Sequence, residues 1–217
     1  MPLMPAADPP ADSFIDWAVA SRPMAGQDLS GDIATVQTSG HRAVIAVIDG
    51  LGHGPEAAAA AQAAARVVEK HRAEPLEALL LLAHEHLADS RGAAATLAIV
   101  DGATGRLEWL GVGNVNGTLL RADDEARPRT HGVFLCRGVL GYLLPSLHIT
   151  MPLALAPGDL LMFATDGVRG DLAGAVRPEV PVGRLAETIL AEQATTEDDA
   201  LVLVARYRGP AGTAPDR

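Results

Sequence analysis

Acidic residues stand at the ends of several apolar, β-branched runs in this sequence. They are Asp32, Asp49, Asp166 and Asp198, and Gly50 directly follows the second of them. An aspartate at a strand end extends from a rigid element, and a neighbouring glycine lets the backbone approach a ligand closely. We therefore expect these carboxylates to line one shared cleft.

Carboxylate and carbonyl oxygens are hard donors, and they suit Mg²⁺, Mn²⁺ or Ca²⁺ better than Zn²⁺. Four converging carboxylates repel one another, and two divalent ions would neutralise them. A single Asp-Gly pair, however, is more often only a turn. Asp101-Gly102 is expected to be such a turn, because it lies between the two strands of a predicted hairpin. From the pattern alone, a metal site and a coincidence of turns both stay open.

The predicted elements do not alternate regularly between strand and helix. Strands are expected at 14–21, 33–38, 42–48, 96–100, 107–112, 115–120, 133–136, 147–153, 160–164 and 200–207, and helices at 55–72, 75–90 and 182–192. Adjacent strands joined by turns favour antiparallel sheets. We expect an α+β fold: two packed antiparallel sheets flanked by helices, in a four-layer α-β-β-α sandwich.

Composition limits the possible functions. Hydrophobic residues make up 48% of the 217 residues, whereas the net charge is −10 and aromatic residues are 3%. An acidic chain with few aromatic side chains is a poor binder of nucleic acid or membrane surfaces. No apolar stretch reaches the length of about 18 residues that a membrane helix needs. One cysteine, Cys136, fits a reducing cytoplasm.

We expect one domain at 13–208, preceded by a disordered leader at 1–12 and followed by a disordered tail at 209–217. No linker or repeat divides the central part of the chain.

Four strings of the sequence resemble, in order, the signatures of SpoIIE-type phosphatases, which belong to the metal-dependent PPM superfamily. The string IDGLGHGPEAA at 48–58 is similar to that family's D-G-x-G-x-G…A-A motif, and PGDLLMFATDGV at 157–168 to its second motif. SGD at 30–32 and DDALVLV at 198–204 are similar to its first and last aspartate motifs. The resemblance spans roughly residues 14–207.

The resemblance implies two Mn²⁺ or Mg²⁺ ions per active site. Asp49 would bridge the ions and the Gly50 carbonyl would bind one of them, directly or through water. Asp32, Asp166 and Asp198 would supply the other carboxylates, with Asp49 and Asp166 as catalytic residues. Asp28 competes with Asp32, and Asp199 with Asp198. The group that protonates the leaving oxygen is either His53 or water.

The implied activity is hydrolysis of phosphoserine or phosphothreonine by a metal-activated water. The short chain is most similar to the stand-alone, RsbX-like phosphatases of the stressosome, which act in the stress response and sigma factor regulation. The implied substrates are phosphorylated STAS-domain proteins, either stressosome scaffolds or anti-anti-sigma factors. A cytoplasmic monomer is expected. The alternatives are a catalytically silent PPM-fold regulator that binds a partner, a binding module that docks through its alanine-rich helix, and an unrelated metal phosphoesterase or nuclease.

Overall fold

A computed structural model describes residues 13–144, 146–147, 151–174 and 176–210 of the chain. The expected leader at 1–12 lies outside the described residues, as does 211–217 of the expected tail. Within the described part, no helix is both long enough and apolar enough to cross a membrane.

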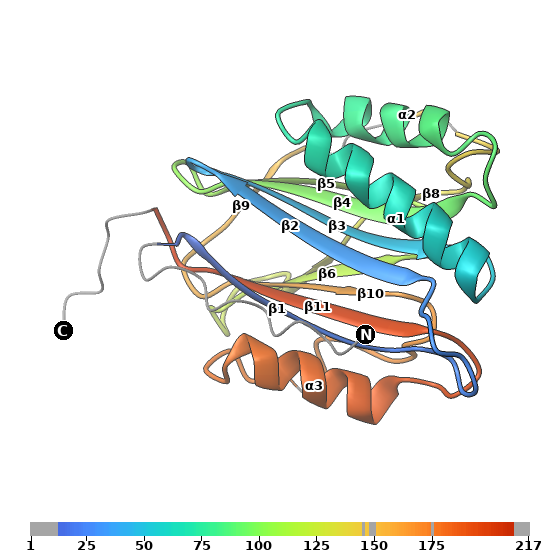
Figure 1. The fold of residues 1–217 in the computed structure, drawn as a ribbon. Helices are drawn as coiled ribbons and strands as arrows, with labels where there is room; N and C mark the ends of the chain where they lie inside the picture. Colours follow the sequence, from blue (N-terminus) through green and yellow to red (C-terminus); the bar gives the residue numbers. More distant parts are fainter. Residues whose placement is uncertain (1–12, 145, 148–150, 175, 211–217) are drawn as a thin grey trace.

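In the described part of the chain, eleven strands form two sheets packed face to face (Figure 1). The first sheet has the order β1 (Ile15–Arg22), β11 (Ala200–Tyr207), β10 (Leu160–Ala164), β6 (Asn116–Leu120) and β7 (Thr130–Gly132). The second has the order β2 (Asp32–Ser39), β3 (Arg42–Gly50), β4 (Ala93–Asp101), β5 (Arg106–Val112) and β8 (Leu135–Cys136), with β9 (Leu153–Ala154) also paired to β5.

Helices cover both outer faces of this sandwich. The helices α1 (Pro55–Lys70) and α2 (Leu76–His86) lie on the second sheet, and α3 (Val182–Gln193) lies on the first (Figure 1). The predicted four-layer α-β-β-α arrangement is therefore confirmed. One detail differs from purely antiparallel sheets, because the short strand β8 pairs with β5 in parallel.

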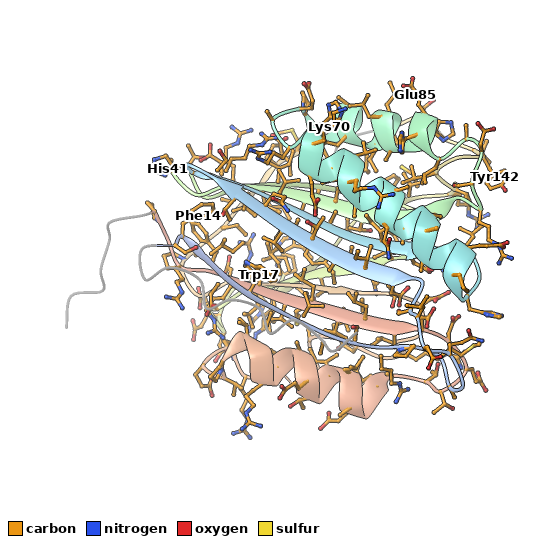
Figure 2. All side chains as sticks on the ribbon, in the orientation of Figure 1. Phe14, Trp17, His41, Lys70, Glu85 and Tyr142 are labelled. Carbon is orange, nitrogen blue, oxygen red and sulfur yellow. The ribbon has the colours of Figure 1, made fainter. Side chains whose placement is uncertain are left out.

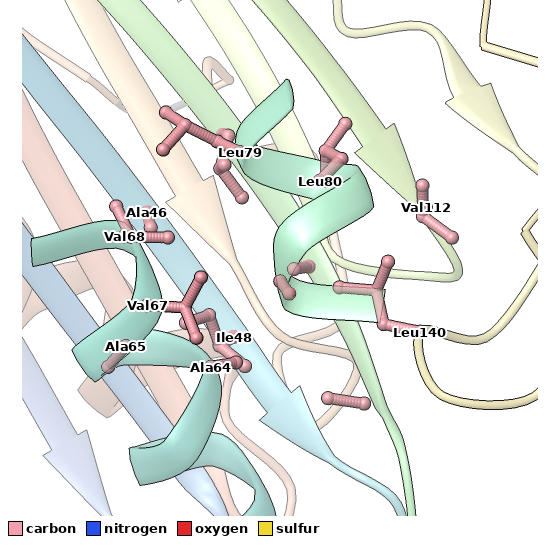
Figure 3. Packing of buried hydrophobic residues seen from close by; sticks show 14 of the residues in the cluster. Ala46, Ile48, Ala64, Ala65, Val67, Val68, Leu79, Leu80, Val112 and Leu140 are labelled. Carbon is pink, nitrogen blue, oxygen red and sulfur yellow. The ribbon is translucent and has the colours of Figure 1, made fainter. Parts of the chain in front are cut away.

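Three apolar layers hold these elements together, and side chains fill the space between them (Figure 2). The layer between the sheets includes Trp109 and Phe163, whose rings meet edge to face with centroids 6.3 Å apart. Under α1, the small residues Ala64 and Ala65 and the valine Val68 pack towards β3 (Figure 3). Alanine suits this layer because it favours a helix and keeps the helix close to the sheet.

The approach of α1 to β3 is closest at the start of the helix. A Cβ atom on Gly50 would lie 2.1 Å from the carbonyl oxygen of Ala57, so only glycine fits there. Pro55 opens the helix, where its missing N–H leaves no bond unmade. The end of β3 is thereby held firmly beneath α1.

Two predicted boundaries were wrong. The extended segment expected at 147–153 is reduced, in the described residues, to β9 at Leu153–Ala154; residues 148–150 lie outside the described part. Between the strands expected at 115–120 and 133–136 the structure has a further short strand, β7, because Thr130, His131 and Gly132 pair with β6. Neither segment has the β-branched run that makes a strand predictable from sequence.

Candidate metal centre

Asp32 and Asp49 face each other across the hairpin formed by β2 and β3. They are direct partners in the antiparallel register, so their side chains extend to the same face of the sheet. The same end of the hairpin is closed by a 3.1 Å hydrogen bond from the Gly50 N–H to the Gly31 carbonyl. Asp32 is only 9% exposed, and Asp49 is half-buried.

The other sheet brings a second pair of acids to this end of the sandwich. Asp166 follows β10 in a turn that is closed by the Val168 N–H and the Thr165 carbonyl. A Cβ atom on Gly167 would lie 1.9 Å from the carbonyl oxygen of Asp199, so the turn lies directly on the segment that precedes β11. Asp166 and Asp198 therefore come from adjoining stretches of backbone.

Thr165 connects the two pairs. Its hydroxyl donates a 2.7 Å hydrogen bond to Oδ2 of Asp32, in the opposite sheet. The hydroxyl oxygen of Thr165 also accepts a 2.9 Å hydrogen bond from the Leu201 N–H at the start of β11. The threonine is 1% exposed, so both bonds are shielded from water.

Asp199 has a different environment from its neighbour Asp198. Its Oδ2 accepts the Gly31 N–H and its Oδ1 accepts the Met24 N–H, both at 2.7 Å, and the residue is 3% exposed. Asp199 thus fastens the loop between β1 and β2 to β11. Asp198 is half-buried, and within the described residues its Oδ1 accepts a hydrogen bond only from the neighbouring Asp199 N–H. This arrangement leaves Asp198 the freer of the two to bind a ligand.

The carboxylates raise one another's pKa values. Burial, followed by repulsion from the other site aspartates, raises the pKa of Asp49 to about 8. Burial also raises the pKa of Asp32 to about 7, with the other aspartates adding to the rise and the Thr165 hydrogen bond opposing it. The pKa of Asp166 is raised by burial and by Asp198. Electrostatic repulsion therefore links Asp32 and Asp49 with Asp166 and Asp198 at this end of the sandwich.

Two further residues at this site were not identified from sequence as functional. Asn114, between β5 and β6, donates a 2.7 Å hydrogen bond to Oδ2 of Asp166. Arg169 carries a positive charge that lowers the pKa of Asp166, against the larger effect of burial. In the sequence, Gly113-Asn114 marks the break between the strands expected at 107–112 and 115–120.

The donor set fits hard divalent cations. The pKa values of Asp32, Asp49 and Asp166 are raised by burial and by repulsion between the site aspartates. Binding of Mg²⁺ or Mn²⁺ would offset this repulsion. Among the described residues, no three histidine, cysteine, aspartate or glutamate side chains are gathered tightly enough to enclose one ion by themselves. Mg²⁺ commonly keeps several water ligands and takes only one or two carboxylates from the protein, which suits this wider spacing.

The remaining candidates are exposed or serve the fold. Asp28 and His53 are exposed, and neither makes a hydrogen bond or ion pair to the described residues. Asp159, in the PGD string, is 1% exposed and accepts hydrogen bonds from Arg121 and from the backbone N–H groups of Ala122 and Ala156. Asp159 therefore fixes the turn before β10.

Comparison with known proteins agrees with this architecture. The family model described as Stage II sporulation protein E (SpoIIE) matches residues 39–208, a range that includes Asp49, Asp166 and Asp198 and begins after Asp32. A search of curated proteins found no significant match.

Solved structures share the fold over most of the chain. One, from work on the bacterial stressosome as a modular system adapted to control secondary messenger signalling, is 29% identical, with a TM-score of 0.79 over 88% of this chain and 99% of its own. RsbX in complex with magnesium is 20% identical, with a TM-score of 0.76 over 88% and 94%. The Mycobacterium tuberculosis serine/threonine phosphatase PstP/Ppp is 18% identical, with a TM-score of 0.64 over 89% and 99%.

Proposed function

This chain belongs to the SpoIIE family of PPM-type phosphatases, and we propose that it is an active, metal-dependent protein serine/threonine phosphatase that hydrolyses phosphoserine or phosphothreonine. One observation carries the proposal: acids from four distant parts of the chain, Asp32, Asp49, Asp166 and Asp198, come within electrostatic reach of one another at one end of the sandwich. A fold alone does not require such a costly concentration of like charge.

The proposed roles follow the placement of each group. Asp49 would bridge two ions, with Asp32, Asp166, Asp198 and the Gly50 carbonyl as further ligands. Bound Mg²⁺ or Mn²⁺ would make a water molecule more acidic and would offset the charge of the phosphoryl oxygens. Thr165 would hold the Asp32 carboxylate in position, and Asn114 that of Asp166. The proton for the leaving serine or threonine oxygen would come from water or from His53.

Phosphorylated STAS-domain proteins are the proposed substrates, either stressosome scaffolds or anti-anti-sigma factors. The similarity to a protein studied in the bacterial stressosome and to RsbX supports this choice. A cytoplasmic location and a monomeric state remain predictions from the sequence.

Metal-dependent turnover is the direct test. Hydrolysis of p-nitrophenyl phosphate should require Mn²⁺ or Mg²⁺, stop with EDTA, and be lost in Asp49→Asn. Asp28→Asn is the matched control, because Asp28 is an exposed acid that makes no hydrogen bond or ion pair to the described residues, and it should keep full activity. Turnover that persists in EDTA, or in Asp49→Asn, would refute the metal mechanism.

The natural substrate needs a separate experiment. Purified STAS-domain proteins from the same genome, phosphorylated on serine or threonine, should lose phosphate in the presence of the enzyme and Mn²⁺. A protein that binds these partners and divalent metal, yet releases phosphate from none of them or from p-nitrophenyl phosphate, would instead be the catalytically silent regulator.

A further inference from the structure

Arg169 lies beside the proposed metal ligands on a firmly held backbone. Its N–H donates a 2.9 Å hydrogen bond to the Gln193 carbonyl, and the Thr195 N–H donates a 2.8 Å bond to the Gly167 carbonyl. Val168 and Ala194 form an isolated antiparallel bridge between these two bonds. The segment that follows Asp166 is therefore held by backbone hydrogen bonds against the segment that leads to Asp198.

The Arg169 side chain, in contrast, is held only weakly. Its guanidinium Nη2 lies 3.4 Å from Oε2 of Glu197, and the two side chains are 69% and 75% exposed. Ion pairs this open to water contribute little, from nothing to about 1 kcal/mol. Arg169 lies three residues after Asp166, and Glu197 directly precedes Asp198. The ion pair therefore joins the two segments that carry the acids of the first sheet. The guanidinium can leave Glu197 at small cost.

A phosphate monoester dianion that approaches the aspartates of the site meets repulsion, and a cation at the rim of the site would offset it. Arginine suits this task because its planar fork can donate two parallel hydrogen bonds to phosphate oxygens. The positive charge of Arg169 already acts on Asp166. The position of Arg169 beside Asp166 and the chemistry of its guanidinium therefore both suit it to bind the phosphate of the substrate.

Other arginines near this end of the molecule are less suitable. The Arg22 guanidinium donates to the Thr195 carbonyl and so supports the backbone. Arg91 pairs with Glu56 across the start of α1. Arg137 is exposed and makes no ion pair within the described ranges, but it follows β8 and its charge is not among the principal influences on the pKa of Asp166, whereas that of Arg169 is. It is the main rival.

We propose that Arg169 is a substrate-binding residue that leaves Glu197 and donates hydrogen bonds to the phosphoryl oxygens of the substrate. This inference rests on the proposed phosphatase function, which it deepens by assigning the phosphate clamp. Glu197 holds the guanidinium at the rim when no phosphate is bound. Because the contact is to the phosphoryl group, it serves any phosphoserine or phosphothreonine sequence.

Steady-state kinetics with p-nitrophenyl phosphate and with a phosphoserine peptide test this role. Loss of a charge-assisted hydrogen bond of about 1.5–3 kcal/mol corresponds to roughly a tenfold to hundredfold change. Arg169→Ala should raise KM for both substrates and the inhibition constant of inorganic phosphate by at least about tenfold, with a smaller effect on kcat. Arg169→Lys should restore part of this loss, and Glu197→Gln should lower KM.

Arg184→Ala is the matched control, because Arg184 is an exposed arginine in an equally weak pair with Glu187 on α3. It should leave every constant unchanged. An unaltered phosphate inhibition constant in Arg169→Ala, or a rise in Arg137→Ala instead, would overturn the assignment. A rise in KM for the peptide alone would also overturn it, since it would indicate a contact to flanking residues.

Calorimetric binding of inorganic phosphate to the Mg²⁺-loaded protein separates the two proposals. One outcome supports the Arg169 assignment but refutes the phosphatase activity: the wild-type protein binds phosphate, Arg169→Ala binds it at least about tenfold more weakly, and no substrate is hydrolysed. If the wild-type protein and Arg169→Ala bind phosphate equally, or neither binds it, the clamp fails whatever the activity.

Discussion

Oδ2 of Asp32 accepts a 2.7 Å hydrogen bond from the Thr165 hydroxyl, although the two residues belong to different sheets. The bond joins the start of β2 to the end of β10. Because the Leu201 N–H donates to the same hydroxyl, three strands meet at one buried oxygen. The position of a proposed metal ligand thus depends on how the two sheets are stacked.

We expect Thr165→Val to lower the free energy of unfolding by about 1–3 kcal/mol. The substitution keeps the shape of the side chain but leaves the Leu201 N–H and the Asp32 carboxylate without their buried partner. Urea denaturation measures the loss. Thr165→Ser, which retains the hydroxyl, should recover most of it; an equal loss in both variants would show that packing, and not the hydrogen bonds, is responsible.

Asp49→Asn should stabilise the metal-free protein while it abolishes stabilisation by metal. The substitution removes a carboxyl group whose ionisation in the folded state is disfavoured by burial and by Asp32 and Asp166, but it also removes the proposed bridging ligand. Thermal unfolding with EDTA and with saturating Mn²⁺ shows both effects, and Asp28→Asn should match wild type in each condition. A normal rise in Tm with Mn²⁺ in Asp49→Asn would rule out its role as a ligand.

The stability of the metal-free protein should depend on pH through the same acids. The pKa of Asp32 is about 7 and that of Asp49 about 8, both above the ordinary value of 3.8. From about pH 4 to 8 the folded state therefore binds more protons than the unfolded state, so the free energy of unfolding falls as pH rises. Tm in EDTA should be higher at pH 5 than at pH 8.

Asp49→Asn isolates this contribution from that of other groups. The fall in Tm between pH 5 and pH 8 should be smaller in the variant than in the wild-type protein. Saturating Mg²⁺ should raise the wild-type Tm more at pH 8 than at pH 5, because protons compete with the ion for the same carboxylates. Identical pH profiles for the variant and the wild type would contradict the raised pKa of Asp49.

Asp198→Ala and Asp199→Ala should have opposite consequences. Without the Asp199 carboxylate, the N–H groups of Met24 and Gly31 lose their buried acceptor, and stability should fall by about 2 kcal/mol or more. Asp198→Ala should leave stability in EDTA nearly unchanged and weaken metal binding. Denaturation and metal titration of both variants decide the matter, and a reversed result would make Asp199 the ligand.

Gly167→Ala should disrupt the junction between β10 and β11. The new methyl group would lie 1.9 Å from the Asp199 carbonyl oxygen, so the backbone must shift, and overpacking of this kind typically costs about 1–3 kcal/mol. Gly132→Ala is the control, since a Cβ atom there meets nothing within 4 Å. Equal stability of the two variants would show that the junction is looser than the structure indicates.

Most elements of the fold were predictable from sequence because their signals are local. The β-branched run before Asp49 and the alanine-rich stretch after Pro55 favour one conformation each, whatever their surroundings. The exceptions, β7 and β9, have no such run; they are strands only because β6 and β5 offer them free edges.

The candidate acids can be proposed from sequence because the motifs mark strand ends, whereas their hydrogen-bond partners cannot. Asn114 and Asp166 are 52 positions apart, and their hydrogen bond depends on β6 pairing with β10. The sequence also could not decide between Asp198 and Asp199. Which carboxylate turns to the loop before β2 is fixed by the docking of β11, and no local pattern encodes it.

The pairing of β1 with β11 has a mechanical consequence. Ile15 lies opposite Tyr207, so the first and last strands meet at one end and run antiparallel for eight residues. A stretching force applied at these two positions would load the hydrogen bonds one after another, as in opening a zipper, and not all together. The domain should therefore yield to a small pulling force along this direction, starting at the end of the sandwich remote from the aspartates.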